Sequence, residues 1–556
     1  MYRSFFFRLL PAAVAATGLL AACGTDGTRD AAGSGAASPD TRLRDSIKTV
    51  VVIYAENRGF DTLYGLFPGA DGIPGVNPTA IGPLLPQTDR GLAGTVLPRL
   101  PKVWHGVTVA GQKVTIAEGR TANQPNRPFQ IDAASGFQDT GVPVGQDVTT
   151  RDLYHRFFEN QMQINGGRND RFAAWANGGG LTMGYYDGSR MQLWKLAQQY
   201  VLADNFFMGA FGGSFLNHQY LVCACVPEYP NADTSAAAKS ISVLETDGAG
   251  RMLPRLALAS RSPASAIDGP PVYVNSSNLT PKNYAGDGTF RAVNTMQPAF
   301  QPSYNDPAPG GNPLLADPAK PSTLPRQTAA TIGDMLDRKK VDWAWYAGAY
   351  NATLATAQGD RKFVMPRPGF QFHHQPFGYF AKFDPTQAAG AAYRAAHLKD
   401  FDAAFLQDAA AGRLPPVSFY KPQGNLNQHA GYANVADGDA HIAGVIAQLQ
   451  ASPQWKNMLI VVTYDENGGF WDHKAVPRGD IWGPGTRIPA LIVSPWARRG
   501  VVDHTQYDTG SILRFITRRF QLDTLPGIAM RDAALAKNGL PPMGDLTAAL
   551  DLSQAK

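Results

Sequence analysis

Two long apolar runs, each followed directly by acidic and amide side chains, constrain this chain most. The runs are Thr49–Ala55 and Met458–Tyr464, and both are rich in β-branched residues without polar alternation. Such continuous runs are typical of parallel strands that are buried on both faces. A third run covers residues 488–493. The sequence therefore predicts a sheet with at least three core strands.

Helical patterns separate these runs from three weaker strand candidates at residues 201–207, 341–346 and 417–420. The helical patterns cover residues 151–164, 191–200, 327–339, 391–411, 440–449 and 509–520. Strands that alternate with helices predict an α/β fold, with a doubly wound, mostly parallel sheet and helices on both faces. Long loop insertions are expected at about residues 68–145 and 260–325, which are rich in Pro and Gly.

The N-terminus has the pattern of an export signal. Arg3 and Arg8 precede an apolar run over residues 9–22, and this run is too short to span a bilayer. It ends in Leu-Ala-Ala-Cys-Gly, which resembles the lipobox of bacterial lipoproteins, so we expect residues 1–22 to be removed and Cys23 to be lipidated. An ordinary signal peptidase site with an incidental Cys is the alternative.

An exported lipoprotein has a predictable layout. Residues 23–46 would form a flexible tether from the membrane, and residues 47–556 a single catalytic domain. Gly24 after the cysteine favours an outer-membrane location facing the periplasm, if the source is Gram-negative. The formal net charge of +5 is too small and too evenly spread to indicate a nucleic-acid partner.

Only two further cysteines remain once Cys23 carries lipid. Cys223 and Cys225 are separated by a single residue, a spacing that we expect to be too close for an easy disulfide. Two sulfurs alone also make a poor metal site. The sequence therefore predicts two buried thiols.

Oxygen-bearing side chains follow the two best strands. Glu56 and Asn57 come after the first, and Asp465, Glu466 and Asn467 after the second. In a sheet of this type, ligands bind at the carboxyl ends of the strands. Carboxylates gathered there would repel one another unless a cation lay among them, and hard divalent cations prefer such oxygens. Simple capping of loops or helices is the alternative.

A third element offers a nucleophile. Residues 209–213 form a Gly-rich turn that leads to Ser214, which is predicted to cap the helix that follows. A helix N-terminus favours a bound phosphate and an ionised oxygen, and contact with a metal would lower the pKa of the hydroxyl further. A plain capping role is the alternative for Ser214.

Two motifs carry a family resemblance. Residues 56–61 (Glu-Asn-Arg-Gly-Phe-Asp) and 465–473 (Asp-Glu-Asn-Gly-Gly-Phe-Trp-Asp-His) resemble the bacterial phosphoesterase family of non-specific phospholipases C and acid phosphatases, in the alkaline phosphatase superfamily. The resemblance runs from about residue 48 to 522. It implies the fold of that superfamily, Ser214 as nucleophile, and one divalent metal ion held by Glu56, Asn57, Ser214, Asp465 and Glu466.

The residues after Ser214 help to choose a branch. Phospholipases C of the family typically have Pro-Asn-Arg there, whereas this chain keeps Asn217 but lacks the Pro and the Arg. Residues 164–170 and 370–376 also resemble the acid phosphatases. Gly59 departs from the Ser of many members.

The same resemblance suggests roles for several polar side chains. His429 is expected to be the acid/base, because the ordinary pKa of histidine lies near working pH. His155 and His374 are expected to bind phosphoryl oxygens. Further substrate contacts are expected from His373, Asn217 and Arg168. A structural imidazole, or a surface arginine, is the alternative for each. His441 and the Asp472-His473 pair are expected to support the site rather than react.

These parts predict metal-dependent hydrolysis of a phosphomonoester through a phosphoserine. A phospholipase C or other phosphodiesterase is one alternative, for which an aromatic wall would be drawn from Trp104, Trp175, Tyr185, Tyr186 and Trp345. A periplasmic lipoprotein that binds phosphate or metal without turnover is the other.

Overall fold

The computed structural model describes residues 38–91, 94–356 and 369–553. The predicted signal peptide, Cys23 and most of the tether lie outside these residues. Among the described helices, none combines the length and the apolar character that crossing a membrane requires. The tether prediction is wrong for its last part, because Pro39–Ser46 forms helix α1, which buries Leu43 and Ser46. Residues Pro39–Lys556 make up one compact unit.

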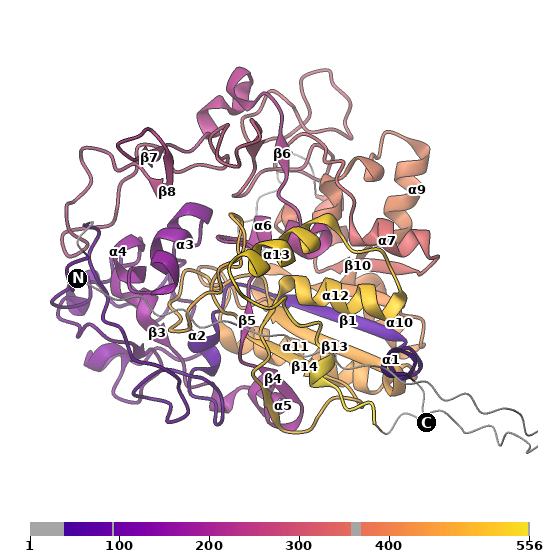
Figure 1. Ribbon diagram of the computed structural model, residues 1–556, viewed down its shortest axis with the longest axis horizontal. Helices are drawn as coiled ribbons and strands as arrows, with labels where there is room; N and C mark the ends of the chain where they lie inside the picture. The colour runs from indigo at the N-terminus through magenta and orange to yellow at the C-terminus, as the bar shows by residue number, and fades with distance from the viewer. Residues whose placement is uncertain (1–37, 92–93, 357–368, 554–556) are drawn as a thin grey trace, which may run out of the picture. The chain divides into compact units, whose positions relative to one another are not determined.

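An eight-stranded sheet organises this unit (Figure 1). Its order is β11 (Leu398–Asp400), β10 (Trp343–Ala347), β12 (Val417–Lys421), β1 (Thr49–Ala55), β13 (Met458–Tyr464), β14 (Ala490–Val493), β4 (Val201–Ala203) and β15 (Val501–Asp503). The first five strands are parallel, and so are β4 and β15. The predicted mostly parallel sheet is confirmed.

The strand β14 runs against both of its neighbours. Residues 465–489, which join it to β13, contain no helix that could carry the chain back across a face of the sheet. The chain therefore re-enters the sheet from the edge at which β13 ends, and a strand that starts there runs in the opposite direction.

Helices cover both faces of the sheet, as predicted. Ile53 of β1 pairs in register with Tyr420 of β12, so Tyr420 and the next residue along β1, Tyr54, point to opposite faces. The Tyr54 hydroxyl donates to a backbone carbonyl of α6 (Ser214–Cys223). The Tyr420 hydroxyl meets His441 of α11 (Val435–Gln450). The two helices therefore lie on opposite faces.

Other helices extend these two layers. The helix α12 (Thr509–Phe520) has the predicted bounds and contacts both α6 and α1, whereas α5 (Gln192–Gln199) contacts α11. The remaining helices are α2 (Phe60–Tyr64), α3 (Phe157–Ile164), α4 (Phe172–Trp175), α7 (Ile332–Arg338), α8 (Tyr350–Ala355), α9 (Ala388–His397), α10 (Leu406–Ala410) and α13 (Pro526–Lys537).

Two predicted elements are divided in the structure. The helix predicted over 391–411 is interrupted where β11 pairs with β10, and the Asp400 side chain then caps a π-helical turn at Phe401–Phe405. The strand predicted over 201–207 divides into β4 and the two-residue strand β5 (Phe206–Phe207), which belongs to another sheet and pairs with β16 (Tyr507–Asp508). In both cases, hydrogen bonds to a strand that is distant in the sequence determine where the predicted element is divided.

Long irregular segments join these elements. The segment between α2 and α3 contains β2 (Phe129–Gln130), which pairs with β3 (Gly184–Tyr185). The segment between α6 and α7 is longer than the insertion predicted at 260–325. It contains the short pairs β6 (Glu228–Tyr229) with β9 (Phe290–Arg291) and β7 (Leu244–Thr246) with β8 (Met252–Leu256).

The prediction of two free thiols is wrong, because Cys223 and Cys225 form a disulfide. Ala224 between them has a left-handed backbone conformation, with φ of 48°, at the end of α6. This turn brings the two Cα atoms to 5.1 Å, within the ordinary range for a disulfide.

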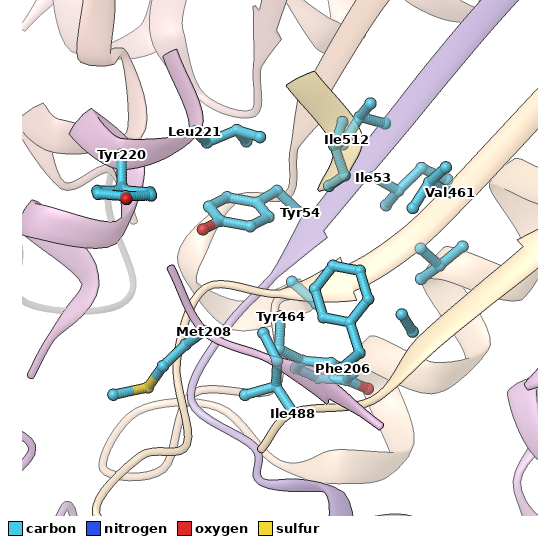
Figure 2. Packing of buried hydrophobic residues seen from close by; sticks show 14 of the residues in the cluster. Ile53, Tyr54, Phe206, Met208, Tyr220, Leu221, Val461, Tyr464, Ile488 and Ile512 are labelled. Atoms are coloured by element: carbon cyan, nitrogen blue, oxygen red, sulfur yellow. The ribbon is translucent and has the colours of Figure 1, made fainter. Parts of the chain in front are cut away.

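The apolar core beside α6 includes residues of β1, β13 and α12 (Figure 2).

Candidate active site

The candidate site lies at the carboxyl ends of the central strands. Glu56 and Asn57 follow β1, Asp465 and Glu466 follow β13, and Ser214 opens α6. The structure thus brings together groups that are about 400 positions apart in the sequence. They adjoin a cavity of about 370 Å³ lined by Glu56, Asp152, His155, Arg156, Gly213, Ser214, Phe215, Asn278, Asn294, Thr295, Gln371, His373, His429 and Tyr432.

Ser214 lies in the wall of this cavity. It is the first residue of α6, and Gly213 is the N-cap, so the predicted capping role of the Ser214 side chain is wrong. Its hydroxyl oxygen lies instead 3.3 Å from Oδ1 of Asn57 and 3.3 Å from Oε1 of Glu466. The hydroxyl therefore faces the oxygen cluster, while free backbone N–H groups of the first helical turn lie beside it.

The two glycines before Ser214 allow close packing. Gly212 has φ of +90°, and a Cβ atom there would lie 2.5 Å from the backbone of Phe157. A Cβ atom on Gly213 would lie 2.8 Å from the carbonyl oxygen of His155. Larger residues would push Ser214 away from His155, so the turn requires glycine at both positions.

Asn57 connects the serine with two histidines. Its backbone has φ of 57°, which Asn tolerates better than most residues, and its N–H donates to Oδ1 of Asp465 at 3.0 Å. Its Nδ2 lies 3.0 Å from Nε2 of His429 and 3.4 Å from Nε2 of His155. Because an amide nitrogen only donates, the His429 ring accepts through Nε2 in this arrangement. Nε2 of His155 also lies 3.6 Å from Oε1 of Glu466, which suits a protonated ring.

Backbone carbonyls hold the other side of both rings. Nδ1 of His155 meets the carbonyl of Leu153 at 2.6 Å, and Nδ1 of His429 meets that of Ala430. Burial lowers the pKa of His155, but Glu466 and then Asp152 raise it more, to about 9. Burial lowers the pKa of His429 below its usual value. His155 is thus a cation near neutral pH and His429 a neutral imidazole.

Glu56 lies at the inner side of the cluster. His374 Nε2 and Lys421 Nζ lie 2.6 and 3.3 Å from its Oε1. Its Oε2 accepts hydrogen bonds from Asn427 and, at 2.8 Å, from the Tyr432 hydroxyl. Although burial opposes ionisation, His374 and Lys421 hold the pKa of Glu56 well below its usual value. Glu56 is therefore a fixed negative charge.

The other two carboxylates have too little positive charge around them. Burial is the main reason why the pKa of Asp465 rises to about 6 and that of Glu466 rises well above its usual value. Oδ2 of Asp465 is buried and accepts no hydrogen bond from the described residues. A divalent cation would correct this imbalance, and the oxygens of Asn57, Ser214, Asp465 and Glu466 are ligands that such an ion prefers. The donor set fits the expected metal.

The two neighbouring histidines 373 and 374 differ in position. His373 lines the cavity, as a substrate contact would. His374 is buried against Glu56 and does not line the cavity, so its predicted contact with phosphoryl oxygens is not supported. The short 3-10 turn Phe372–His374 points the two rings in different directions, with an interplanar angle of 84°.

Two other predicted substrate contacts lie away from the cavity lining. Asn217 is fully buried in α6, where its amide bonds the backbone of Ala210 and the carbonyls of Gly212 and Gly213. It holds the turn before Ser214 instead of facing the cavity. Arg168 is largely exposed, pairs with Asp170 at 2.7 Å and does not line the cavity. Arg168 therefore belongs to a surface ion pair.

The aromatic wall considered for a lipid substrate is absent from the described cavity lining. Trp104, Trp175, Tyr185, Tyr186 and Trp345 are all buried, and none of them lines the cavity. The rings belong to the core of the fold.

Sequence reasoning missed several residues of the site, which are Lys421, Asn427, Tyr432, Asp152 and Arg156. The sequence could have indicated Lys421, because this residue ends the strand pattern that begins at Val417. Ligands bind at the carboxyl ends of such strands, so Lys421 was a candidate site residue as well. Arg156 and Asp152 flank His155 within the helical pattern predicted over 151–164, where nothing distinguished them from the charges of a solvent-exposed helix face.

A second charged cluster lies outside the cavity. Arg487 is fully buried and bonds Asp472 and Asp61, with its NH2 2.9 Å from Oδ1 of Asp61. The His473 ring contacts Asp61 at 2.8 Å through Nδ1 and Asp71 at 3.1 Å through Nε2. This network ties the loop after β13 to the start of α2, which agrees with the supporting role expected of Asp472 and His473.

Comparison with known proteins bears on this geometry. The profile of the phosphoesterase family matches residues 47–523, which cover most of the chain. The chain belongs to this family. The match includes all five predicted metal ligands, Ser214 among them, and it confirms the resemblance drawn from the two motifs.

Curated relatives of this phosphoesterase family member are phospholipases C by name. Non-specific phospholipase C6 of Arabidopsis thaliana is 31% identical over 158 residues, 23% of this chain and 30% of that protein. Non-hemolytic phospholipase C of Pseudomonas aeruginosa is 29% identical over 149 residues, 21% of this chain and 22% of that protein. The chain thus matches less than a third of the length of these relatives.

Among solved structures, a protein of the alkaline phosphatase superfamily from Vibrio parahaemolyticus overlaps with 62% of this chain and 64% of its own. The sequence identity is 9% and the TM-score 0.28, values too low to support any argument about substrate.

Proposed function

We propose that this family member hydrolyses phosphate esters, and preferentially phosphomonoesters, through Ser214. The observation that carries the proposal is the position of the Ser214 hydroxyl, 3.3 Å from both Asn57 Oδ1 and Glu466 Oε1 in the wall of a polar cavity. A nucleophile beside a helix N-terminus and an oxygen-rich cluster suits attack on phosphorus. Family membership supports the same chemistry.

The reaction would proceed in two displacements. The Ser214 oxygen forms a bond to phosphorus while the bond to the leaving oxygen breaks, and that oxygen takes a proton from a cavity histidine. Water then attacks the phosphoserine and returns a proton to that histidine, the Oγ–P bond breaks and phosphate leaves. A divalent cation bound by the oxygen cluster would neutralise phosphoryl charge and favour the ionised hydroxyl.

Each chain residue has a distinct part in these steps. His429 and His155 lie in the cavity wall with Nε2 toward Asn57, close to the nucleophile. Arg156 and His373 line the same cavity and can meet the phosphoryl oxygens and the leaving group. The positive charge of Arg156 and His155 suits the two negative charges of a monoester, which is why we favour that class.

The first test compares Ser214→Ala with wild type and with Ser189→Ala, which removes an exposed hydroxyl. A phosphomonoester and a phosphodiester with the same leaving group serve as substrates, with added divalent metal. We expect Ser214→Ala to lose at least about 1,000-fold in kcat. Wild-type turnover by Ser214→Ala would contradict the proposal.

A phosphodiesterase of the phospholipase C type is the second candidate, and the names of the relatives favour it. The same experiment separates the two, because a diesterase would turn over the diester faster than the monoester. If wild type turns over neither ester, a phosphate- or metal-binding lipoprotein becomes the better proposal.

We also propose that the mature protein is exported and anchored through lipid on Cys23. The support is the charged start, the apolar run and the lipobox-like end of residues 1–23. Metabolic labelling with an alkyne fatty acid, in wild type and Cys23→Ala, tests it. Equal labelling of both proteins would contradict the anchor.

A further inference from the structure

A buried lysine lies between the carboxylates at the inner side of the site. Lys421 ends β12 and is fully buried, with its Nζ 3.3 Å from Oε1 of Glu56 and 4.0 Å from Oδ2 of Asp465. The same ammonium donates to the Ala55 carbonyl at 3.2 Å and lies 5.4 Å from the centre of the Tyr54 ring. Each of these four neighbours suits a positive charge.

Without that lysine, the inner side would resemble a metal site. Glu56, His218 and Asp465 are all buried, and each places a ligand atom within 4.8 Å of the others. Nε2 of His218 is buried with no hydrogen-bond partner among the described residues. Nδ1 of His218 donates to the Ser214 carbonyl at 2.8 Å, so Nε2 carries the lone pair of a potential ligand.

We propose that Lys421 is a built-in cation that occupies the inner side of the cluster and thereby limits the protein to one metal ion. The oxygens of Asn57, Ser214, Asp465 and Glu466 then hold the exchangeable ion, and Lys421 fixes Glu56 and the inner oxygen of Asp465, Oδ2, beside it. Lys421 acts through these carboxylates, so it is a positioning residue. The inference rests on the metal dependence of the proposed function.

A second cluster of potential metal ligands in this fold also contains a built-in basic side chain. Asp61, Asp472 and His473 also have ligand atoms within 4.8 Å of one another, and there Arg487 bonds both carboxylates. Because a guanidinium or ammonium cannot dissociate from the chain, each cluster keeps this charge whatever the concentration of metal.

The test measures how many metal ions bind. Metal-free protein is equilibrated with excess Mn²⁺, the bound metal is counted by elemental analysis, and electron paramagnetic resonance shows whether bound ions are close neighbours. We expect one equivalent and a six-line mononuclear spectrum for wild type. We expect Lys421→Ala, which empties the inner side, to take up a second equivalent with a spin-coupled spectrum.

Lys474→Ala is the matched control, because it removes a partly buried lysine outside the site that pairs with a carboxylate, Asp71, at 2.6 Å. It should bind one equivalent. Two equivalents in wild type, or wild-type stoichiometry and affinity in Lys421→Ala, would overturn the role of Lys421. Failure of wild type to bind any Mn²⁺ would instead count against metal dependence and the proposed function.

A second variant covers the case in which Lys421→Ala does not fold. The double variant Lys421→Met/Glu56→Gln removes both charges of the pair and keeps similar volumes. If charge pairing is the role of Lys421, the double variant should be more stable than Lys421→Met alone, as judged by thermal unfolding. A double variant no more stable than that single one would overturn the inference.

Discussion

The Asn57 and Ser214 side chains meet although 157 positions separate them, with the Ser214 hydroxyl donating to Oδ1 of Asn57 at 3.3 Å. The opposite end of the same amide faces His429. One carboxamide thus orients both the nucleophile and a cavity histidine, so changes at position 57 should affect both.

Asn57→Gly should fold but react slowly. Glycine accepts the left-handed backbone at this position, so only the carboxamide is lost, and we expect kcat to fall about 100-fold. Asn57→Ala should lose the same activity and, in addition, about 1 kcal/mol of stability, because its Cβ disfavours this backbone. Steady-state kinetics and urea unfolding would show the two effects. Equal stability of both variants would contradict the backbone argument.

His155→Gln should reveal proton donation through its dependence on the leaving group, because His155 is the protonated histidine of the cavity. An alkyl phosphate needs a proton on the departing oxygen, so we expect a loss of about 100-fold in kcat/KM. A nitrophenyl phosphate leaves readily without one and should lose less than about 10-fold. His441→Gln, which alters a ring on α11 that contacts Tyr420, is the control. Equal losses on both substrates would argue that His155 does not donate the proton.

Arg156→Met should weaken substrate binding more than turnover. The Arg156 guanidinium lines the cavity, and its polar contacts with the described residues are long, 3.5 Å to Asn278 and 4.0 Å to Glu159. A charge-assisted hydrogen bond to phosphate should be worth roughly a 10-fold change in KM. Arg168→Met is the matched control, since that arginine pairs with Asp170 outside the cavity. An equal change in both variants would refute the assignment.

Stability should decline in mild alkali because of His473. Burial lowers its pKa, but the contacts with Asp61 and Asp71 raise it more, to about 9, above the ordinary 6.5. A raised pKa means that the protonated ring stabilises the fold fully below pH 6.5 and that this contribution disappears as the pH passes 9. The decline should be on the order of 2–3 kcal/mol.

Chemical unfolding at pH 6, 7.5 and 9 would measure this decline. His473→Gln should start from a lower stability and show a flatter profile over the same range. A wild-type profile that is level between pH 6.5 and 9 would show that the ring is not charged in the folded protein.

The parts of the site that the sequence predicts are those that directly follow strong strand patterns. Continuous apolar runs located β1 and β13, and the rule for carboxyl ends then united Glu56 with Asp465 across about 400 positions. The bounds of α12 were equally accessible, because its apolar residues recur with helical spacing between clear ends. In each case local sequence and global fold favour the same answer.

The remaining parts depend on contacts that no local pattern encodes. His373 and His374 are adjacent and chemically identical, so only the packed structure assigns one to the cavity and the other to Glu56. Asn217 carries a carboxamide that could bind a ligand, but this side chain instead holds the turn before Ser214. The left-handed Ala224 that permits the Cys223–Cys225 bond is likewise set by the end of α6, since alanine itself does not favour that conformation.

The helix α1 leads into β1 at the amino end of the strand, and the cavity residues follow its carboxyl end. Seven residues of extended chain separate these points by roughly 20 Å. A bead, dye or affinity tag joined ahead of Pro39 would therefore be attached at the edge of the sheet away from the substrate entrance. Immobilising the protein by that end should leave its catalytic mouth accessible to dissolved esters.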